Sequence, residues 1–457
     1  MASTKADTAD QLSASQRAGF GVSDFGFNLY YTGLNLFLLY YYTDVLGIRP
    51  AVAGLIFALP LVWDAITDPV MGLIASRTRT RFGSYRPYLL FGGPPLAISF
   101  VMMFAAPLIF PGAVVLASAA AHVVFRTCYT VVSIPYTALS ANMTRDSGER
   151  GALAGVRMFF ATLGGLFTVL MTLPLSATLG GGDLKTGFFY VAAIYAVIAT
   201  AIFLTTFAAT RERSDLKPAV SPDVAEMRRL IARNRALWVL ILAIVVGATG
   251  SAIFGKALVY YVKYVAGLEV SITGALIALT ASVSFSVPIW TLLSRYISKR
   301  TAWLSGAAIT LTMQACLFLF PPQTEGLFLA LIVVMGFGNG AFVVTFWSML
   351  PDTVEYGQWR SGVRDEGLVF GINQLALKAA SGLGIGVLGF LLEAVGYIAN
   401  QPQTPETIHG LRQVSILVPL ACGAVSAALI CFYPIDRKLH GRLVRAIEWR
   451  ERRRSLA

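Results

Sequence analysis

The stretch Val62–Gly72, with the sequence VWDAITDPVMG, lies inside an apolar run that extends from about Ala51 to Ala75. Asp64 and Asp68 are four residues apart, so in a helix both side chains project from one face. An ionisable side chain at membrane depth is costly and normally faces a cavity or a partner. Two neighbouring carboxylates stay ionised only beside a cation or a basic group; otherwise one takes up a proton. The stretch therefore predicts a cation or proton site inside a transporter.

The whole chain has the composition of a helical membrane protein. Of its 457 residues, 56% are hydrophobic and 13% are charged, against about 25% charged residues in a soluble domain. The first 16 residues are mostly polar and the first apolar run is long, so we expect no cleavable signal peptide. The cysteines show neither metal nor disulfide spacing, and we interpret them as small core residues. They are Cys128, Cys316, Cys422 and Cys431.

Apolar stretches repeatedly exceed the roughly 20 residues that cross a bilayer. We expect an all-α membrane protein with twelve transmembrane helices in two six-helix halves. The expected spans are residues 18–45, 51–75, 86–108, 112–143, 151–180, 186–209, 237–266, 270–297, 300–320, 325–353, 365–397 and 411–436.

A long polar interruption divides the twelve spans into two sets of six. It contains Pro218, Pro222 and seven basic residues. We interpret it mainly as a tether, although Pro222 to Arg235 is also suited to a short amphipathic helix on the membrane surface. The predicted organisation is an N-terminal six-helix bundle (1–210), a cytoplasmic linker (211–236), a C-terminal six-helix bundle (237–436) and a basic cytoplasmic tail (437–457).

The distribution of basic residues explains the net charge of +12. The predicted outer loops hold only Arg49, Lys185 and Arg412. Because cytoplasmic loops carry the excess of lysine and arginine, both termini are predicted to be cytoplasmic. The clusters Arg77–Arg81 and Arg452–Arg454 are then topology signals and contacts to membrane lipids, not a nucleic-acid site.

Several ordered motifs resemble one known family. They are Tyr40–Gly47 (YYYTDVLG), Trp63–Pro69 (WDAITDP), Arg81–Pro87 (RFGSYRP), Ser133–Tyr136 (SIPY), Arg145–Arg157, Asp352–Gly357 (DTVEYG) and Lys378. The chain resembles the melibiose permease and its relatives, the glycoside–pentoside–hexuronide:cation symporters of the major facilitator superfamily. The resemblance implies the fold of that superfamily and cation-coupled (Na⁺ or H⁺) symport of a sugar, glycoside or sugar acid by alternating access. It also implies a multi-pass protein of a bacterial inner membrane, and we expect a monomer with no cofactor beyond the coupling ion.

The resemblance assigns a cation site. Asp64 and Asp68 match the carboxylates that bind the coupling cation, as its metal ligands where that cation is Na⁺ or Li⁺. Thr130 matches a threonine of the same site, and Lys378 matches a lysine close to it. A buried ammonium facing two buried carboxylates leaves one excess negative charge, enough to hold one small cation. The alternative, a static salt bridge locking the halves, is disfavoured because one lysine cannot neutralise two aspartates.

The solute site departs from the melibiose pattern. The family's two sugar-binding aspartates correspond here to Asn28 and Ser133, although Asp24 lies one turn before Asn28. Arg157 matches an arginine of the family's sugar site. Arg126 lies seven residues before Ser133 on the same helical face as Thr130.

These departures, together with Lys256 inside the seventh span, suit a neutral or acidic solute such as a uronide. The alternative is that Arg126 and Lys256 snorkel or pair structurally.

Further side chains are candidates for the solute site or a gate. Aromatic rings predicted near mid-membrane are suited to stacking on a sugar ring, or else to packing: Tyr30, Tyr31, Tyr129, Trp347 and Phe370. Asn373 and Gln374 offer amides about one turn before Lys378. A cytoplasmic gate is expected from opposed charges: Arg145, Arg150, Glu355, Arg364 and Glu366.

Other function classes fit the sequence less well. A membrane enzyme would need a nucleophile, base or metal set, but His122, His409 and His440 are scattered and no HExxH or GxSxG motif occurs. A non-transporting sensor would share the fold without solute flux. Within transporters, a carrier of a lipid-like or other non-sugar solute is the alternative, because one fold hosts many functions.

Overall fold

The computed structural model describes residues 11–144, 147–212, 224–362, 365–436, 439–443, 445–447 and 449. Across these residues the chain is helical and forms no β-strand beyond one isolated bridge between Thr80 and Gly83. The chain divides into two compact units, Met1–Pro218 and Ala219–Ala457. The exact limits of the linker and of the basic tail stay predictions.

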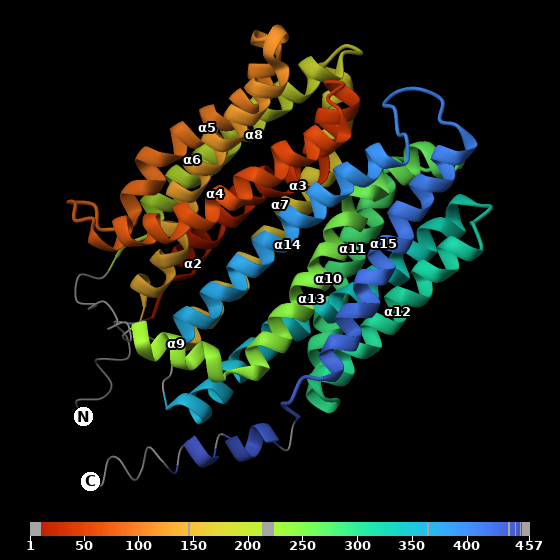
Figure 1. Ribbon diagram of the computed structural model, residues 1–457. Helices are drawn as coiled ribbons and strands as arrows, with labels where there is room; N and C mark the ends of the chain where they lie inside the picture. The colour runs from red at the N-terminus through yellow and green to blue at the C-terminus, as the bar shows by residue number, and fades with distance from the viewer. Residues whose placement is uncertain are drawn as a thin grey trace. The chain divides into compact units, whose positions relative to one another are not determined.

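Both units are built from long helices that run alongside one another (Figure 1). The first unit holds α2 (Ala14–Gly21), α3 (Ser23–Tyr40), η1 (Tyr41–Val45), α4 (Pro50–Arg77), α5 (Arg86–Ile109), η2 (Pro111–Ala113), α6 (Val114–Met143), α7 (Ser147–Leu179) and α8 (Leu184–Ala209). The second holds α9 (Val224–Arg233), α10 (Arg235–Tyr260), η3 (Tyr261–Val265), α11 (Ile272–Tyr296), α12 (Lys299–Leu319), α13 (Glu325–Ser361), α14 (Glu366–Ala394) and α15 (Pro405–Cys431).

The predicted all-α membrane fold is confirmed. Within the described ranges, eleven helices are long and apolar enough to cross a membrane. The predicted first span, 18–45, is helical as the end of α2, α3 and η1, but it is not among the eleven. The polar side chains that interrupt its apolar sequence are Asp24, Asn28, Asn35 and Asp44.

Two predicted helix boundaries were wrong by six residues or more. The helix predicted over 325–353 continues to Ser361, because Pro351 does not end it and Gly362, at φ 79°, closes it in the left-handed region. The helix predicted from residue 411 begins at Pro405. Thr404 caps it, since its side chain accepts a hydrogen bond from the Thr407 backbone N–H at 3.2 Å. Both extra segments are polar, which is why apolar runs alone do not reveal them.

The two units repeat one packing pattern. In the first unit α3 packs on α7 and α8, α4 packs on α6, and α5 packs on α6 and α8. In the second unit α10 packs on α14 and α15, α11 on α13, and α12 on α13 and α15. The first long helix of each pattern also ends alike, in a π-helical turn that begins after Tyr40 in one unit and after Tyr260 in the other. This is the internal repeat expected of a transporter of this type.

The loop between α4 and α5 is tied to the end of α8. The Glu212 carboxylate accepts hydrogen bonds from the backbone N–H groups of Ser84, Tyr85 and Arg86 at 2.7, 2.8 and 2.7 Å. These donors lie at the start of α5, where a negative charge is favoured. Arg86 in turn donates to the Phe207 carbonyl at 2.7 Å. The basic segment Arg77–Arg81 therefore belongs to a structured loop, and its contacts to lipid stay a prediction.

The described part of the predicted linker contains a helix. α9 covers Val224–Arg233 and packs on α13 of its own unit, with Leu230 fully buried. Asn234 then caps α10 by accepting the Leu237 N–H at 3.0 Å. The helix predicted in this segment is confirmed, and its contact with a membrane surface stays a prediction.

We predict that Gly164→Ala lowers the apparent melting temperature by several degrees. A Cβ at Gly164 would lie 2.7 Å from the Phe25 carbonyl oxygen and 2.9 Å from the Phe25 Cα, so α3 and α7 would have to move apart. Such overpacking costs about 1–3 kcal/mol. Gly155→Ala on the same helix is the control, because nothing lies within 4 Å of its Cβ. Equal melting temperatures for the two variants would contradict the contact.

Candidate functional site

A seam of polar contacts joins α4 to α6 in the first unit. The Arg126 guanidinium donates through Nη2 to the Asp64 carboxylate, with side-chain exposures of 9% and 1%. One turn further along both helices, Thr130 Oγ1 donates to Asp68 Oδ1 at 2.7 Å. The spacing of four residues on each helix lets both carboxylates meet polar groups on the facing helix. The predicted shared face of Asp64 and Asp68 is therefore present.

Two further contacts extend the seam. His122 Nδ1 lies 3.1 Å from the Ile56 carbonyl oxygen, and Trp63 Nε1 donates to Thr127 Oγ1 at 2.9 Å. The sequence analysis assigned no role to His122 or Thr127. On α6, His122 lies four residues before Arg126 and Thr127 lies three residues before Thr130, so a helical spacing pattern could have identified both. That pattern is informative only once α4 is known to pack on α6.

The opposite face of α4 is apolar and open. Val62 and Ile66 are 65% and 61% exposed. Pro69 follows Asp68 directly and has no N–H, so it cannot donate to the carbonyl of Ala65 one turn earlier. A backbone carbonyl lacking its usual helical donor therefore lies at the level of the two aspartates.

The Asp64–Arg126 pair corrects the charge argument made from sequence. That argument set Lys378 alone against Asp64 and Asp68, and treated Arg126 as a candidate solute contact. In the structure a second basic group, Arg126, already forms an ion pair with Asp64 within the same unit. Lys378 lies on α14 in the other unit, and its approach to the α4 carboxylates stays a prediction.

A second charged cluster connects α3, α6 and α7. Arg157 donates through Nε to Asp24 Oδ2 at 2.7 Å and through Nη2 to Asp24 Oδ1 at 3.2 Å. The Tyr136 hydroxyl donates to the same Oδ2 at 2.6 Å and lies 3.0 Å from the Phe20 carbonyl oxygen. Two predicted solute residues, Asp24 and Arg157, thus lie together but bind one another. Tyr136 is a member that the sequence analysis missed.

The neutral candidates of the first unit surround these clusters. Asn28 donates to the Asp24 carbonyl at 2.8 Å, and the Arg126 guanidinium lies 5.8 Å from the Tyr129 ring centroid. Tyr31 is 49% exposed, whereas Tyr30 is fully buried against Phe100, its ring centroid 4.5 Å away. Tyr30 is therefore a packing residue. Ser133 is half-buried on α6, and its carbonyl accepts the Thr137 hydroxyl.

The candidates of the second unit lie on α10, α13 and α14. Lys256 and Asn373 are buried, at 5% and 0% exposure. Neither polar atom of the Asn373 side chain has a hydrogen-bond partner within the described ranges. Trp347 is 40% exposed and stacks near Phe346, Phe370 packs against the core of this unit, and Gln374 follows Asn373 on an exposed part of α14. Their roles toward a solute stay predictions.

The predicted gate is only partly described. Arg145 and Arg364 lie outside the described residues, as does the side chain of Arg150. Glu355 binds His440 in its own unit, with Nε2 and Oε2 2.7 Å apart. Glu366 is the first residue of α14. Pairing of these charges between the halves stays a prediction.

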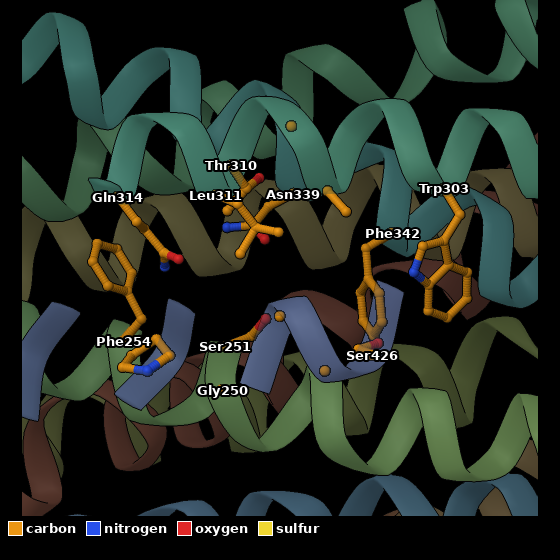
Figure 2. A pocket seen from close by; sticks show the side chains of 15 residues that line it. Gly250, Ser251, Phe254, Trp303, Thr310, Leu311, Gln314, Asn339, Phe342 and Ser426 are labelled. Carbon is orange, nitrogen blue, oxygen red and sulfur yellow. The ribbon is translucent and has the colours of Figure 1, made fainter. Parts of the chain in front are cut away.

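A small cavity with a mainly apolar lining and several polar groups lies inside the second unit. Its volume is about 50 Å³, far below the roughly 300 Å³ at which small-molecule sites begin. Figure 2 shows polar side chains from α12 and α13 meeting α10 and α15 across it: Ser251, Trp303, Thr310, Gln314, Asn339 and Ser426. The Gln314 Oε1 is buried without a hydrogen-bond partner in the described residues. The cavity excludes a sugar but has room for water, which needs roughly 10–15 Å³ per molecule.

The comparisons with known proteins identify the family. A family profile described as "MFS/sugar transport protein" matches residues 19–437. The chain belongs to this family of the major facilitator superfamily. It is a multi-pass integral membrane transporter and not an enzyme, and the predicted resemblance to the sugar–cation symporters is confirmed.

Curated relatives and solved structures agree with this assignment. The chain is 31% identical to an uncharacterized symporter, YnaJ, of Bacillus subtilis over 98% of its length and 97% of the relative's. It is 32% identical to an isoprimeverose transporter of Lactiplantibacillus pentosus over 93% and 89%. An inward-facing bacterial homologue of the lysosomal transporter Spinster has a TM-score of 0.70 at 15% identity, covering 96% of this chain and 99% of that one. This last likeness concerns the fold alone.

We predict that Tyr136→Phe and Asp24→Asn each lower the apparent melting temperature and that their effects are not additive. A hydrogen bond to a charged group contributes about 1.5–3 kcal/mol, and partners in one network couple by about 0.5–3 kcal/mol. A thermal scan of both single variants and the double variant measures the coupling. Tyr190→Phe, an exposed tyrosine on α8, is the control. Simple additivity would show that the three side chains do not act as one cluster.

We also predict that the cavity holds water. Trp303 and Trp290 are both 2% exposed, but Trp303 lines the cavity, whereas Trp290 Nε1 donates to the Phe337 carbonyl at 2.8 Å. Hydroxyl-radical footprinting with synchrotron radiation should oxidise Trp303, beside trapped water, faster than Trp290. Ala307→Leu fills the cavity and should protect Trp303. Equal oxidation of the two tryptophans would mean that the cavity is dry.

Proposed function

We propose that the protein is a cation-coupled symporter of a sugar, glycoside or sugar acid that works by alternating access. The observation that carries the proposal is the pair of acids, Asp64 and Asp68, turned toward polar groups of α6 inside membrane-spanning helices. Buried carboxylates at membrane depth mark ion pathways. In a sugar transport family of the major facilitator superfamily, their natural role is to bind the coupling cation.

The solute class rests on the family and on its named relatives. Besides the isoprimeverose transporter, the chain is 28% identical to a glucuronide carrier protein homolog of Escherichia coli over 97% of both chains. Isoprimeverose is a sugar and a glucuronide is a sugar acid, so both fit the predicted class. Arg126 and Arg157 already pair with Asp64 and Asp24, so the proposed solute class rests on the family and on these named relatives.

Coupling follows from linkage between the two sites. Cation binding at α4 adds positive charge beside its carboxylates and orders the helices that carry the solute residues. By thermodynamic necessity, the solute then raises the affinity for the cation by the same factor. When both are bound the two halves rock about the site, and a half-loaded carrier crosses poorly.

The excess of basic residues in the predicted inner loops supports cytoplasmic termini, and we propose that the protein lies in a bacterial inner membrane. Transporters of this type bind their solute between two repeats of a single chain, so we propose a functional monomer.

We predict that Asp68→Asn abolishes uphill, cation-stimulated uptake. Its carboxamide keeps the shape of the side chain and a bond to Thr130 but loses the negative charge that holds a cation. Uptake of a radiolabelled solute into proteoliposomes, under an imposed Na⁺ or H⁺ gradient, measures the effect. Thr200→Val on α8, away from the seam, should retain uptake. Full uphill uptake by Asp68→Asn would exclude this carboxylate from coupling.

The solute is found by thermal-stability screening of the purified protein against glycosides, uronides and sugar acids, with and without Na⁺. A ligand that binds only the folded protein raises its melting temperature, by a free energy of about 2.7 kcal/mol at a hundred times its Kd. Stabilisation by lipid-like solutes and not by any sugar would favour the alternative solute class over the proposed one.

A further inference from the structure

The contact between Arg126 and Asp64 bears on which cation the α4 carboxylates can hold. We propose that Arg126 is a resident counter-cation that reserves Asp64, so that the coupling cation is held at Asp68 and Thr130 and sodium binds weakly. Arg126 is then a residue that determines cation specificity. This inference rests on the symport function proposed above and deepens it.

The first step concerns ligands. A small alkali cation is a hard ion that prefers several oxygen ligands, and a seat shared by both aspartates would take oxygens from each. In this chain the Asp64 carboxylate already accepts a hydrogen bond from Arg126 Nη2. A guanidinium keeps its charge at any physiological pH. A sodium ion bound by both aspartates would therefore lie beside the fixed positive charge of Arg126.

The second step concerns displacement. The Arg126 and Asp64 side chains are 9% and 1% exposed, so water cannot solvate either charge in place of its partner. Separating a buried ion pair leaves an uncompensated charge in an apolar setting, which is strongly unfavourable. Sodium would have to overcome this cost in order to recruit Asp64. The seam also holds both helices in register on either side of the pair, through His122 and the Ile56 carbonyl and through Thr130 and Asp68.

The third step concerns what is left for the coupling cation. Asp68 presents a carboxylate within 2.7 Å of the Thr130 hydroxyl, one helical turn from the reserved Asp64. This pair supplies one carboxylate instead of two, which lowers both the negative charge and the number of oxygens available to a metal ion. Replacing Arg126 by a neutral residue removes the guanidinium charge from beside Asp64, so a sodium ion bound by both carboxylates would no longer lie next to it.

The test is a comparison of NaCl with KCl at matched ionic strength, read as the melting temperature of the purified full-length protein. We expect no sodium-specific stabilisation of the unaltered protein. We expect Arg126→Gln to gain it, with an apparent Kd for sodium at least about tenfold lower, equivalent to about 1.4 kcal/mol. Arg126→Lys, which keeps the charge, should gain none.

Arg157→Gln is the matched control. Arg157 also forms an ion pair with an aspartate between helices of the same unit, but its partner is Asp24 on α3. Its removal should destabilise the protein without creating sodium binding. Sodium stabilisation in both glutamine variants would show a general salt effect and overturn the proposal, as would a folded Arg126→Gln protein that gains none.

The unaltered protein decides the question if Arg126→Gln does not fold. Sodium-specific stabilisation that Asp64→Asn removes would show that Asp64 is a sodium ligand despite Arg126, and would overturn the proposal; absence of that stabilisation supports it. These binding results are independent of transport. A protein that carries no solute under any gradient refutes the proposed symport, whereas sodium-driven uptake with normal sodium affinity refutes only the role of Arg126.

Discussion

The cost of placing charge in an apolar medium governs the first unit. A buried ion is tolerated only with a partner, and removal of either partner is strongly destabilising. Asp64 meets Arg126 between α4 and α6, and Asp24 meets Arg157 between α3 and α7. Two ion pairs therefore cross-link four helices in addition to the hydrogen bonds and side-chain packing between them, which matters because lipid chains are as apolar as the helix surfaces.

The same constraint connects stability to function. A carrier must hold its helices together and still bind and release a cation, so its buried charged groups cannot all be in fixed ion pairs. In the first unit, arginines answer Asp24 and Asp64, while Thr130 gives Asp68 a neutral hydrogen bond. The two carboxylates of α4 therefore meet different groups of α6, a guanidinium at Asp64 and a hydroxyl at Asp68.

The repeated architecture explains where the remaining polar groups lie. Each unit packs its helices in the same order, and each ends its first long helix with a π-helical turn. Such turns distort the regular hydrogen-bond ladder and are frequent at functional sites. The second unit carries no counterpart of the α4 acids on α11. Its core instead contains a small cavity where a few amide and hydroxyl groups lie among apolar side chains. The two repeats thus share a scaffold but differ in chemistry.

The sequence by itself determined the class of the protein, the helices and the importance of Asp64 and Asp68. These follow from composition, from apolar length and from a spacing of four residues, all of which are local properties. Only the tertiary structure decided which residues form ion pairs with one another. Arg126 and Asp64 are 62 residues apart and Arg157 and Asp24 are 133 apart, so no local pattern joins them. The side chains meet because helices distant in the sequence pack together, and that packing pairs Arg126 with Asp64, a structural pairing that the sequence offered only as one of two roles for Arg126.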